Sequence, residues 1–320
     1  MEETKKVFGI AETFGIAAPS GMKVIGYASR SRFVPVVDSH YVFRKEILRD
    51  VLAWLAEPSG DGLYLSGPTG CGKSSLICQI AARLNLPVQR VNAHARLEVT
   101  DLIGHFTVVN GSMSFVDGPL ATAMKGGHLF LLDELDVLDP ATTAGLNTIL
   151  GGGPLSIPQT GEVIDPQPGF RFVATGNTCG AGDRSGLYQG TLRQNLAFMD
   201  RFWVVSVPYP DADLEKTILR STCPCLPELI RDKMIEIANE IRRLFMGGNG
   251  DGAAIGVTLS TRSLVRWAQL AIRFSGAPLT YSLDRALTFR AEPGTRESIL
   301  QIVQRHFGDQ VTLPSEVTRS

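Results

Sequence analysis

Short apolar runs alternate with segments of helical periodicity over the first two-thirds of the chain. Continuous apolar runs are typical of strands that are buried on both faces of a parallel sheet. We expect such strands at 62–66, 88–92, 128–132, 170–174 and 202–207. Apolar residues at helical spacing predict helices at 41–56, 74–84, 94–102, 118–125 and 139–150. This alternation predicts an α/β fold, in which a parallel sheet is flanked by helices and joined by right-handed crossovers.

The pattern changes after about residue 210, where helical periodicity continues but strand signals become few. Helices are expected at 226–245, 261–274, 281–289 and 297–307. We therefore expect an irregular arm at 1–40, an α/β core at 41–210, an all-α domain at 211–308 and a tail at 309–320. Within the core, apolar segments on either side of Asn110-Gly111 predict a β-hairpin near 106–116.

The segment 67–74 reads Gly-Pro-Thr-Gly-Cys-Gly-Lys-Ser, which is the spacing of a phosphate-binding loop. Its glycines allow a tight turn that brings backbone N–H groups to phosphate oxygens. Lys73 can reach the β- and γ-phosphates, and the Ser74 hydroxyl can bind Mg²⁺. A chance glycine-rich turn is the alternative, but the flanking strand and helix favour nucleotide binding. The predicted binding residues are Gly67, Pro68, Thr69, Gly70, Cys71, Gly72, Lys73, Ser74 and Ser75.

A second nucleotide signal follows the apolar run 129–132, where Asp133 and Glu134 end a predicted strand. Asp133 is expected to hold Mg²⁺, and Glu134 is expected to orient and polarise the attacking water. Asn177 ends another predicted strand, from which its amide could bind both the γ-phosphate and the water. By itself each site could be an ordinary loop, but together with the phosphate loop they indicate ATP hydrolysis.

Two arginines have no role that their local sequence reveals. Arg201 stands just before a predicted strand, and a surface pair with Asp200 would explain it equally well. Arg262 opens the predicted helix 261–274 and could be a solvated helix residue.

The composition mainly excludes classes of function and indicates few specific ones. The formal net charge of −1 gives no basic footprint for nucleic acid, although a local basic pore would not be visible in it. No apolar run reaches membrane-spanning length, and the first residues are not followed by a signal-type apolar core. The five cysteines are odd in number and unevenly spread, which favours reduced thiols. We therefore expect a cytoplasmic protein.

The order of these motifs resembles that of AAA+ ATPases of the MoxR branch and, within it, the CobS-type ATPase subunits of aerobic cobaltochelatase. The most specific segments are Gly176-Asn-Thr178, Gly186-Leu-Tyr-Gln-Gly-Thr191 and Met199-Asp-Arg201. The likeness covers roughly residues 14–210, and the helical domain only loosely. The resemblance implies an AAA+ nucleotide-binding core with an all-α lid.

The resemblance also implies roles for single residues. Asn177 falls on the sensor 1 position, and Arg262 falls on the sensor 2 position of the lid. Arg201 falls on the arginine finger, which reaches the nucleotide of a neighbouring subunit. Asn92 matches the polar residue that can hold the catalytic glutamate in an inactive state, and the hairpin near 106–116 matches a pore-lining insertion in helix 2. These roles require a ring, for which six subunits are the norm of the family.

The implied activity is Mg²⁺-dependent ATP hydrolysis that remodels a protein client, such as a von Willebrand A-type protein or a chelatase subunit. One alternative is a nucleic-acid motor or loader, for which Arg30, Arg32, Arg44, Lys45 and Arg49 offer some basis. The near-neutral net charge makes a nucleic-acid partner less expected. Another alternative is a ring that binds nucleotide without hydrolysis, which the Asp133-Glu134 pair disfavours.

Overall fold

A computed structural model describes residues 4–109, 111–183, 186–247, 255–308 and 312–313. The chain divides into two compact units. Unit 1 contains Met1–Asp38, Phe43–Pro68 and Lys73–Val207, and unit 2 contains Ser39–Val42, Thr69–Gly72 and Pro208–Ser320. Each unit is described by itself below.

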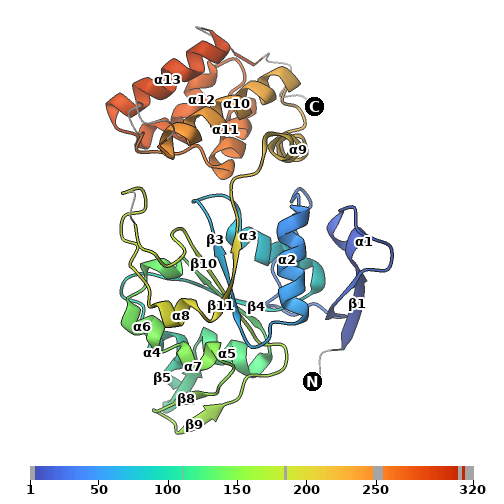
Figure 1. Ribbon diagram of the computed structural model, residues 1–320, viewed down its shortest axis with the longest axis vertical. Coiled ribbons are helices and arrows are strands. Elements are labelled where there is room, and N and C mark those ends of the chain that lie inside the picture. Colours follow the sequence, from blue (N-terminus) through green and yellow to red (C-terminus); the bar gives the residue numbers. More distant parts are fainter. Residues whose placement is uncertain (1–3, 110, 184–185, 248–254, 309–311, 314–320) are drawn as a thin grey trace. The chain divides into compact units, whose positions relative to one another are not determined.

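Unit 1 is built on a sheet of five strands that all run parallel (Figure 1). Their order across the sheet is β11 (Phe202–Ser206), β3 (Gly62–Ser66), β10 (Arg171–Gly176), β7 (Leu129–Asp133) and β4 (Val88–Asn92). The central strands carry fully buried side chains, including Leu63, Phe130 and Val173. The predicted α/β architecture is therefore confirmed, because apolar runs buried on both faces of a parallel sheet are what the sequence pattern required.

The predicted helices at 74–84 and 118–125 agree with the structure to within one residue at each end, whereas those at 41–56 and 94–102 are shorter. The helices of unit 1 that follow its N-terminal arm are α2 (Lys45–Ala56), α3 (Lys73–Leu84), α4 (Val99–Ile103), α5 (Pro119–Gly126), the 3₁₀ turn η1 (Leu135–Val137), α6 (Pro140–Ala144), α7 (Asn147–Leu150) and α8 (Leu196–Met199). The single helix expected at 139–150 is two short helices interrupted at Gly145. Glycine is a poor helix former, and here it also lets the backbone approach Val99 closely.

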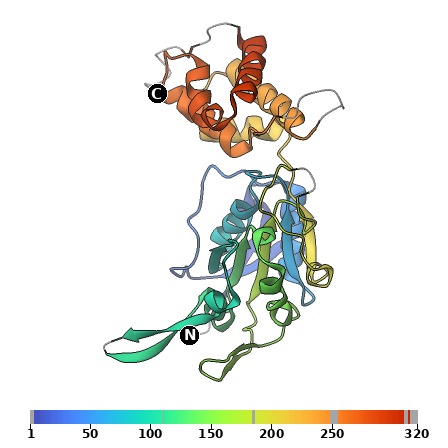
Figure 2. The same ribbon diagram turned by 90° about the vertical axis from the view of Figure 1, so that its left-hand side faces the viewer.

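Two β-hairpins extend from the part of unit 1 that follows the N-terminal arm, and Figure 2 shows the longer one projecting beyond the sheet. The hairpin predicted near 106–116 consists of β5 (Gly104–Val109) and β6 (Ser112–Asp117). Its predicted turn residue Asn110 lies outside the described residues. The second hairpin, β8 (Leu155–Ile157) with β9 (Glu162–Ile164), was not predicted, because strands of three residues leave too short a pattern.

The N-terminal arm is more regular than expected, which corrects the prediction for residues 1–40. It contains β1 (Lys5–Gly9), α1 (Ile10–Phe14) and β2 (Lys23–Tyr27). The two strands pair antiparallel and form a third, longer-looped hairpin, the β1–β2 hairpin. Gly26 explains how this pair packs on the core, because a Cβ atom there would collide with the carbonyl oxygen of Leu84. The two strands are distant in sequence, so no local turn pattern could predict that they pair.

Unit 2 is helical in its described parts. Its helices are α9 (Ala212–Thr222), α10 (Glu228–Phe245), α11 (Thr261–Arg273), α12 (Leu279–Ala286), the 3₁₀ turn η2 (Thr288–Arg290) and α13 (Pro293–Phe307). The helix expected at 281–289 thus begins earlier and gives way to a 3₁₀ turn. Trp267, Leu264 and Ile237 are fully buried in its core. Of the predicted tail at 309–320, all but residues 312 and 313 lies outside the described residues. No described helix is both long and apolar enough to cross a membrane.

Candidate nucleotide site

Several predicted site residues of unit 1 meet at one edge of the parallel sheet. Parallel strands place their carboxyl ends at the same edge, which is where α/β proteins bind ligands. The phosphate loop leaves β3 at Gly67, Glu134 follows β7, and Asn177 follows β10. The Gly67 amide donates to the carbonyl of Gly176 at 3.2 Å, which joins two of these strand ends.

Lys73 is the first residue of α3 and is buried at this edge. Its ammonium donates to the carbonyl oxygens of Gly67 at 2.7 Å and Pro68 at 3.0 Å. It also donates to Oδ1 of Asn177 at 2.9 Å. The structure therefore brings together the predicted phosphate-binding lysine and the predicted sensor amide.

Asp133 is buried at the end of β7 and accepts hydrogen bonds on both carboxylate oxygens. Its Oδ1 accepts from the hydroxyl of Ser74 at 2.5 Å and from that of Thr175 at 3.0 Å. Its Oδ2 accepts from Nε of Arg90 at 2.5 Å. Ser74 and Asp133, the two predicted Mg²⁺ ligands, are thus in direct contact. Arg90 and Thr175 were not predicted, because only the register of the sheet places them here.

Glu134 stands next to Asp133 but is exposed. Its backbone adopts the left-handed region, with φ 60° and ψ 40°. Its amide donates to the Thr175 hydroxyl at 3.1 Å, which helps to hold that conformation. This unusual backbone conformation directs the two neighbouring carboxylates to different environments. Asp133 is buried, and Glu134 is exposed to water.

Asp136 is a fully buried carboxylate that the site prediction missed. Its Oδ2 accepts from the backbone amides of Asn177 at 2.6 Å and Thr178 at 3.0 Å, and from the Thr178 hydroxyl at 3.1 Å. Nearby, burial and the negative charge of Asp136 raise the pKa of Tyr64 far above its usual range. A Cβ atom at Gly176 would collide with the Tyr64 hydroxyl, so only glycine fits there.

The tip of the phosphate loop, Thr69–Gly72, belongs to unit 2. The Tyr209 hydroxyl donates to the carbonyl of Thr69 at 2.9 Å. Gly70 has φ +70°, and a Cβ atom there would lie 2.5 Å from Oγ of Ser260 and 3.7 Å from Cβ of Arg262. The predicted sensor 2 residue is therefore next to the loop tip, with its own side chain exposed.

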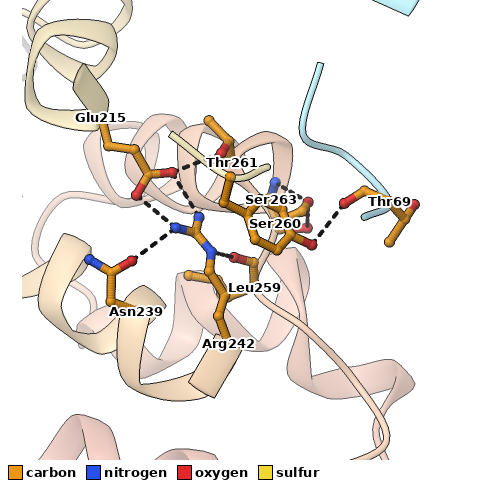
Figure 3. A network of polar contacts seen from close by, with 9 residues as sticks. Thr69, Glu215, Asn239, Arg242, Leu259, Ser260, Thr261 and Ser263 are labelled. Atoms are coloured by element: carbon orange, nitrogen blue, oxygen red, sulfur yellow. Dashed lines mark hydrogen bonds and ion pairs between the residues drawn. The ribbon is translucent and has the colours of Figure 1, made fainter. Parts of the chain in front are cut away.

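A buried ion pair supports the start of α11 in unit 2 (Figure 3). The guanidinium of Arg242 contacts both carboxylate oxygens of Glu215, at 2.7 and 2.9 Å. The same guanidinium donates to the Leu259 carbonyl at 2.8 Å, and the Thr261 hydroxyl donates to Glu215 at 2.8 Å. Arg242 also lies over the ring of Tyr209, 4.4 Å from its centroid. These contacts fix the backbone that leads into Arg262.

Three predicted residues do not join the cluster around Lys73. Arg201 precedes β11 at the opposite end of the sheet, where Phe202 pairs with Gly62, and its Nη1 contacts the Ala197 carbonyl at 3.4 Å. Asn92 is opposite Asp133 in the register, but no hydrogen bond joins it to Glu134 in the described residues. Ser75 is exposed in the first turn of α3.

Comparison with known proteins gives matches to both units. A family model described as "AAA domain (dynein-related subfamily)" matches residues 62–202, and one described as "CbbQ/NirQ/NorQ C-terminal" matches residues 215–306. The aerobic cobaltochelatase subunit CobS of Sinorhizobium sp is 32% identical over 93% of this chain and 90% of its own. The uncharacterized protein YojN of Bacillus subtilis is 31% identical over 69% of this chain and 72% of its own. A solved RuvB mutant from Thermotoga maritima is 14% identical, covering 84% of this chain and 73% of its own, with a TM-score of 0.48.

Proposed function

Because this chain belongs to the AAA+ ATPases of the MoxR and CobS type, we propose that it hydrolyses ATP with Mg²⁺ in a ring of identical subunits and remodels a protein client. The observation that carries the proposal is the contact of Ser74 with a buried Asp133, next to the contact of Lys73 with Asn177. A hydroxyl, a carboxylate, an ammonium and an amide thus converge at the edge where the phosphate loop begins.

The residues present fit Mg²⁺. A hydroxyl oxygen and a carboxylate oxygen are the hard ligands that it prefers, and Ser74 and Asp133 already place theirs together. No group of three or more metal-binding side chains occurs in the described part of the chain, which suits an ion held by few protein ligands and by phosphates. When bound, Mg²⁺ would neutralise charge that develops on the phosphates.

Side chains and backbone amides of the protein would carry out the remaining steps of phosphate binding and water activation. The Lys73 ammonium would exchange its carbonyl contacts for phosphate oxygens, and the loop amides at 67–72 would hold those oxygens. The exposed Glu134 carboxylate would orient a water molecule and accept its proton. The Asn177 amide, fixed by Asp136, would contact the same water and the γ-phosphate. Arg262 would add a positive charge from the lid.

Arg201 gives the reason to propose a ring. It precedes the first residue of β11, whereas the phosphate loop follows the last residue of β3 beside it. A strand of five residues spans about 13 Å, so Arg201 is at the wrong end of the sheet to serve its own loop. An arginine supplied by a neighbouring subunit is worth about 10³–10⁵ in rate in related systems. We propose six subunits, following the resemblance.

The client is proposed from the family alone. A von Willebrand A-type protein or a chelatase subunit agrees with the resemblance and with the relative that is named as a cobaltochelatase subunit. The nucleic-acid alternative gains no favouring observation. Arg30 donates to the carbonyls of Val34 and Pro35, Arg32 lies over the Phe33 ring, and Arg49 pairs with Asp50.

Complementation between two inactive variants tests the ring. Lys73→Ala keeps the arginine finger but loses the phosphate contact, and Arg201→Ala keeps the site but loses the finger. Each alone should turn over ATP at least about 100-fold more slowly than wild type. Their mixture should regain activity, because one subunit completes the site of the other. A mixture no more active than its components, or equal specific activity of wild type from dilute monomer to oligomer, would contradict the proposal.

A further inference from the structure

Unit 1 contains a cavity of about 810 Å³ that the nucleotide chemistry does not use. It lies between the β1–β2 hairpin and α2, and it reaches the start of β7 and β10 at Leu129 and Arg171. These strands carry the nucleotide residues at their other ends. Its inner wall is apolar, with Leu48 and Leu52 from α2. A volume of this size is typical of a ligand-binding pocket.

One face of the β1–β2 hairpin continues this apolar surface outward. Val7 and Ile25 are directly opposite each other in the register, and their exposed fractions are 56% and 61%. The other face packs on the core, where Gly26 touches the Leu84 carbonyl. The hairpin forms a sheet of its own with two strands, so in the described structure its edges pair with no further strand. Isolated two-stranded sheets are marginal and can accept another strand.

Positive charge predominates around the apolar surface, because Glu46 is the one acidic residue among those that line the cavity. Lys5 and Lys23 share the hairpin face of Val7 and Ile25, and Lys45 lines the cavity from α2. Within the described ranges none of these lysines forms an ion pair, and neither does Arg171 on the inner wall. The guanidinium of Arg171 donates from Nη1 to the carbonyls of Pro168 and Phe170, but its Nε atom is buried without a hydrogen-bond partner. This buried charge and the exposed lysines favour a negatively charged ligand from outside the chain.

We propose that the cavity and the open hairpin face together bind an extended, acidic segment of the partner protein. Apolar side chains of that segment would fill the cavity and cover Val7 and Ile25. Its carboxylates would meet Lys5, Lys23 and Lys45, and its backbone would pair with a hairpin edge. A small amphipathic anion would fill the cavity, which Ile25 lines, but would leave Val7 uncovered. The inference rests on the proposed function only in assuming a protein partner.

Fluorescence anisotropy with a synthetic peptide tests this site on the full chain. The probe is a fluorescein-labelled peptide of five Glu-Val repeats, and the comparison peptides are five Lys-Val and five Glu-Ser repeats. The Glu-Val peptide should bind at least about tenfold more tightly than either, because it alone supplies both apolar groups and negative charge. Ile25→Asp, Lys23→Glu and the cavity-filling Ala53→Trp should each weaken its binding about tenfold.

Matched variants separate the site from a general effect. Lys6→Glu changes the charge of the same strand on its other face, and Met113→Asp changes a side chain that is 71% exposed on β6. Both should keep the affinity within about twofold. Ile25→Asp should keep wild-type ATP turnover, so a failure of peptide binding would leave the ATPase proposal standing.

Three results would overturn the inference. One is equal affinity of wild type, Ile25→Asp and Lys23→Glu for the Glu-Val peptide. Another is loss of assembly by Ile25→Asp in sedimentation, which would make a second copy of this chain the occupant. The third is binding of decanoate, blocked by Ala53→Trp, without any binding of the peptide, which would make the occupant a small anion.

Discussion

Oδ2 of Asp136 lies 2.6 Å from the backbone nitrogen of Asn177. The same oxygen accepts from the amide and the hydroxyl of Thr178, so one buried carboxylate holds the segment that follows β10. The Asn177 side chain then meets the Lys73 ammonium. A residue with no hydrogen bond to the phosphate loop in the described structure thus holds the backbone of the predicted sensor residue.

Replacing Asp136 with asparagine should therefore destabilise unit 1 and reduce turnover together. The amide retains the size but weakens three hydrogen bonds to a charged acceptor, which costs about 2 kcal/mol of unfolding free energy. Urea unfolding and ATP turnover measure the two effects. Asp139→Asn is the control, because Asp139 caps α6 at an exposed position and asparagine caps equally well. An Asp136→Asn variant as stable as Asp139→Asn would show that these hydrogen bonds contribute little.

Glu134→Gln should bind ATP with nearly wild-type affinity and lose at least about 100-fold in turnover, because glutamine cannot accept a proton from water. Binding of a fluorescent ATP analogue and release of phosphate measure the two quantities separately. Glu57→Gln changes an exposed carboxylate at the end of α2 and should leave both unchanged. Normal turnover by Glu134→Gln would remove Glu134 from the mechanism.

Lys73→Ala and Asn177→Ala should separate binding from turnover. Lys73 supplies the ammonium for the phosphates, so its loss should abolish measurable ATP binding. In Asn177→Ala the ammonium keeps its contacts with Gly67 and Pro68, so affinity should change by less than about threefold while turnover falls at least about tenfold. Titration calorimetry with ATP and steady-state kinetics distinguish the two outcomes. Equal loss of affinity in both variants would mean that Asn177 mainly positions the lysine.

The ion pair between Arg242 and Glu215 gives a prediction for unit 2. Glu215→Leu leaves a buried guanidinium without its carboxylate and should lower the unfolding free energy by about 3–5 kcal/mol. The double variant Glu215→Leu with Arg242→Met should recover most of this loss, since no charge then remains buried. Urea unfolding of wild type, Glu215→Leu, Arg242→Met and the double variant gives the coupling energy. As a surface control, Arg49→Met breaks the exposed pair with Asp50 and should cost less than about 1 kcal/mol.

Tyr64 should make the protein sensitive to alkali. Burial, and secondarily the charge of Asp136, raise its pKa in the folded state, whereas in the unfolded chain it ionises near pH 10. The stabilisation is complete below about pH 10 and is lost as the pH rises further, because only the unfolded state then releases the proton. Tyr64→Phe should therefore lose less stability than wild type between pH 9 and about 11 in urea unfolding. At pH 7 the two should differ by less than about 1 kcal/mol, because the hydroxyl has no hydrogen-bond partner among the described residues.

The sequence was sufficient to predict the parts of the site that are formed by consecutive residues. Segment 67–74 and the pair Asp133-Glu134 are recognisable from their residue spacing, and the apolar runs predicted the positions of the five strands. Arg90 and Asp136 could not be predicted as site residues, because Arg90 reaches Asp133 through strand pairing and Asp136 reaches Asn177 across 41 residues of chain. The pairing of β1 with β2 in the N-terminal arm was not predicted for the same reason, because the two strands are distant in sequence and pair only in the folded chain.

Because the five strands all run in the same direction, the two ends of the sheet carry different residues. Arg201 is at one end of the sheet and Lys73 is at the other. If Arg201 completes the site of a neighbouring subunit, as proposed, unlike surfaces of two subunits must be in contact. Two chains related by a two-fold axis present the same surface to each other and would leave both sites incomplete. Contacts between unlike surfaces repeat in a head-to-tail order, which either closes by rotation or continues as a filament. If Arg201 acts in a neighbouring subunit as proposed, the assembly is therefore a closed ring or a helical filament, and a two-fold dimer is excluded.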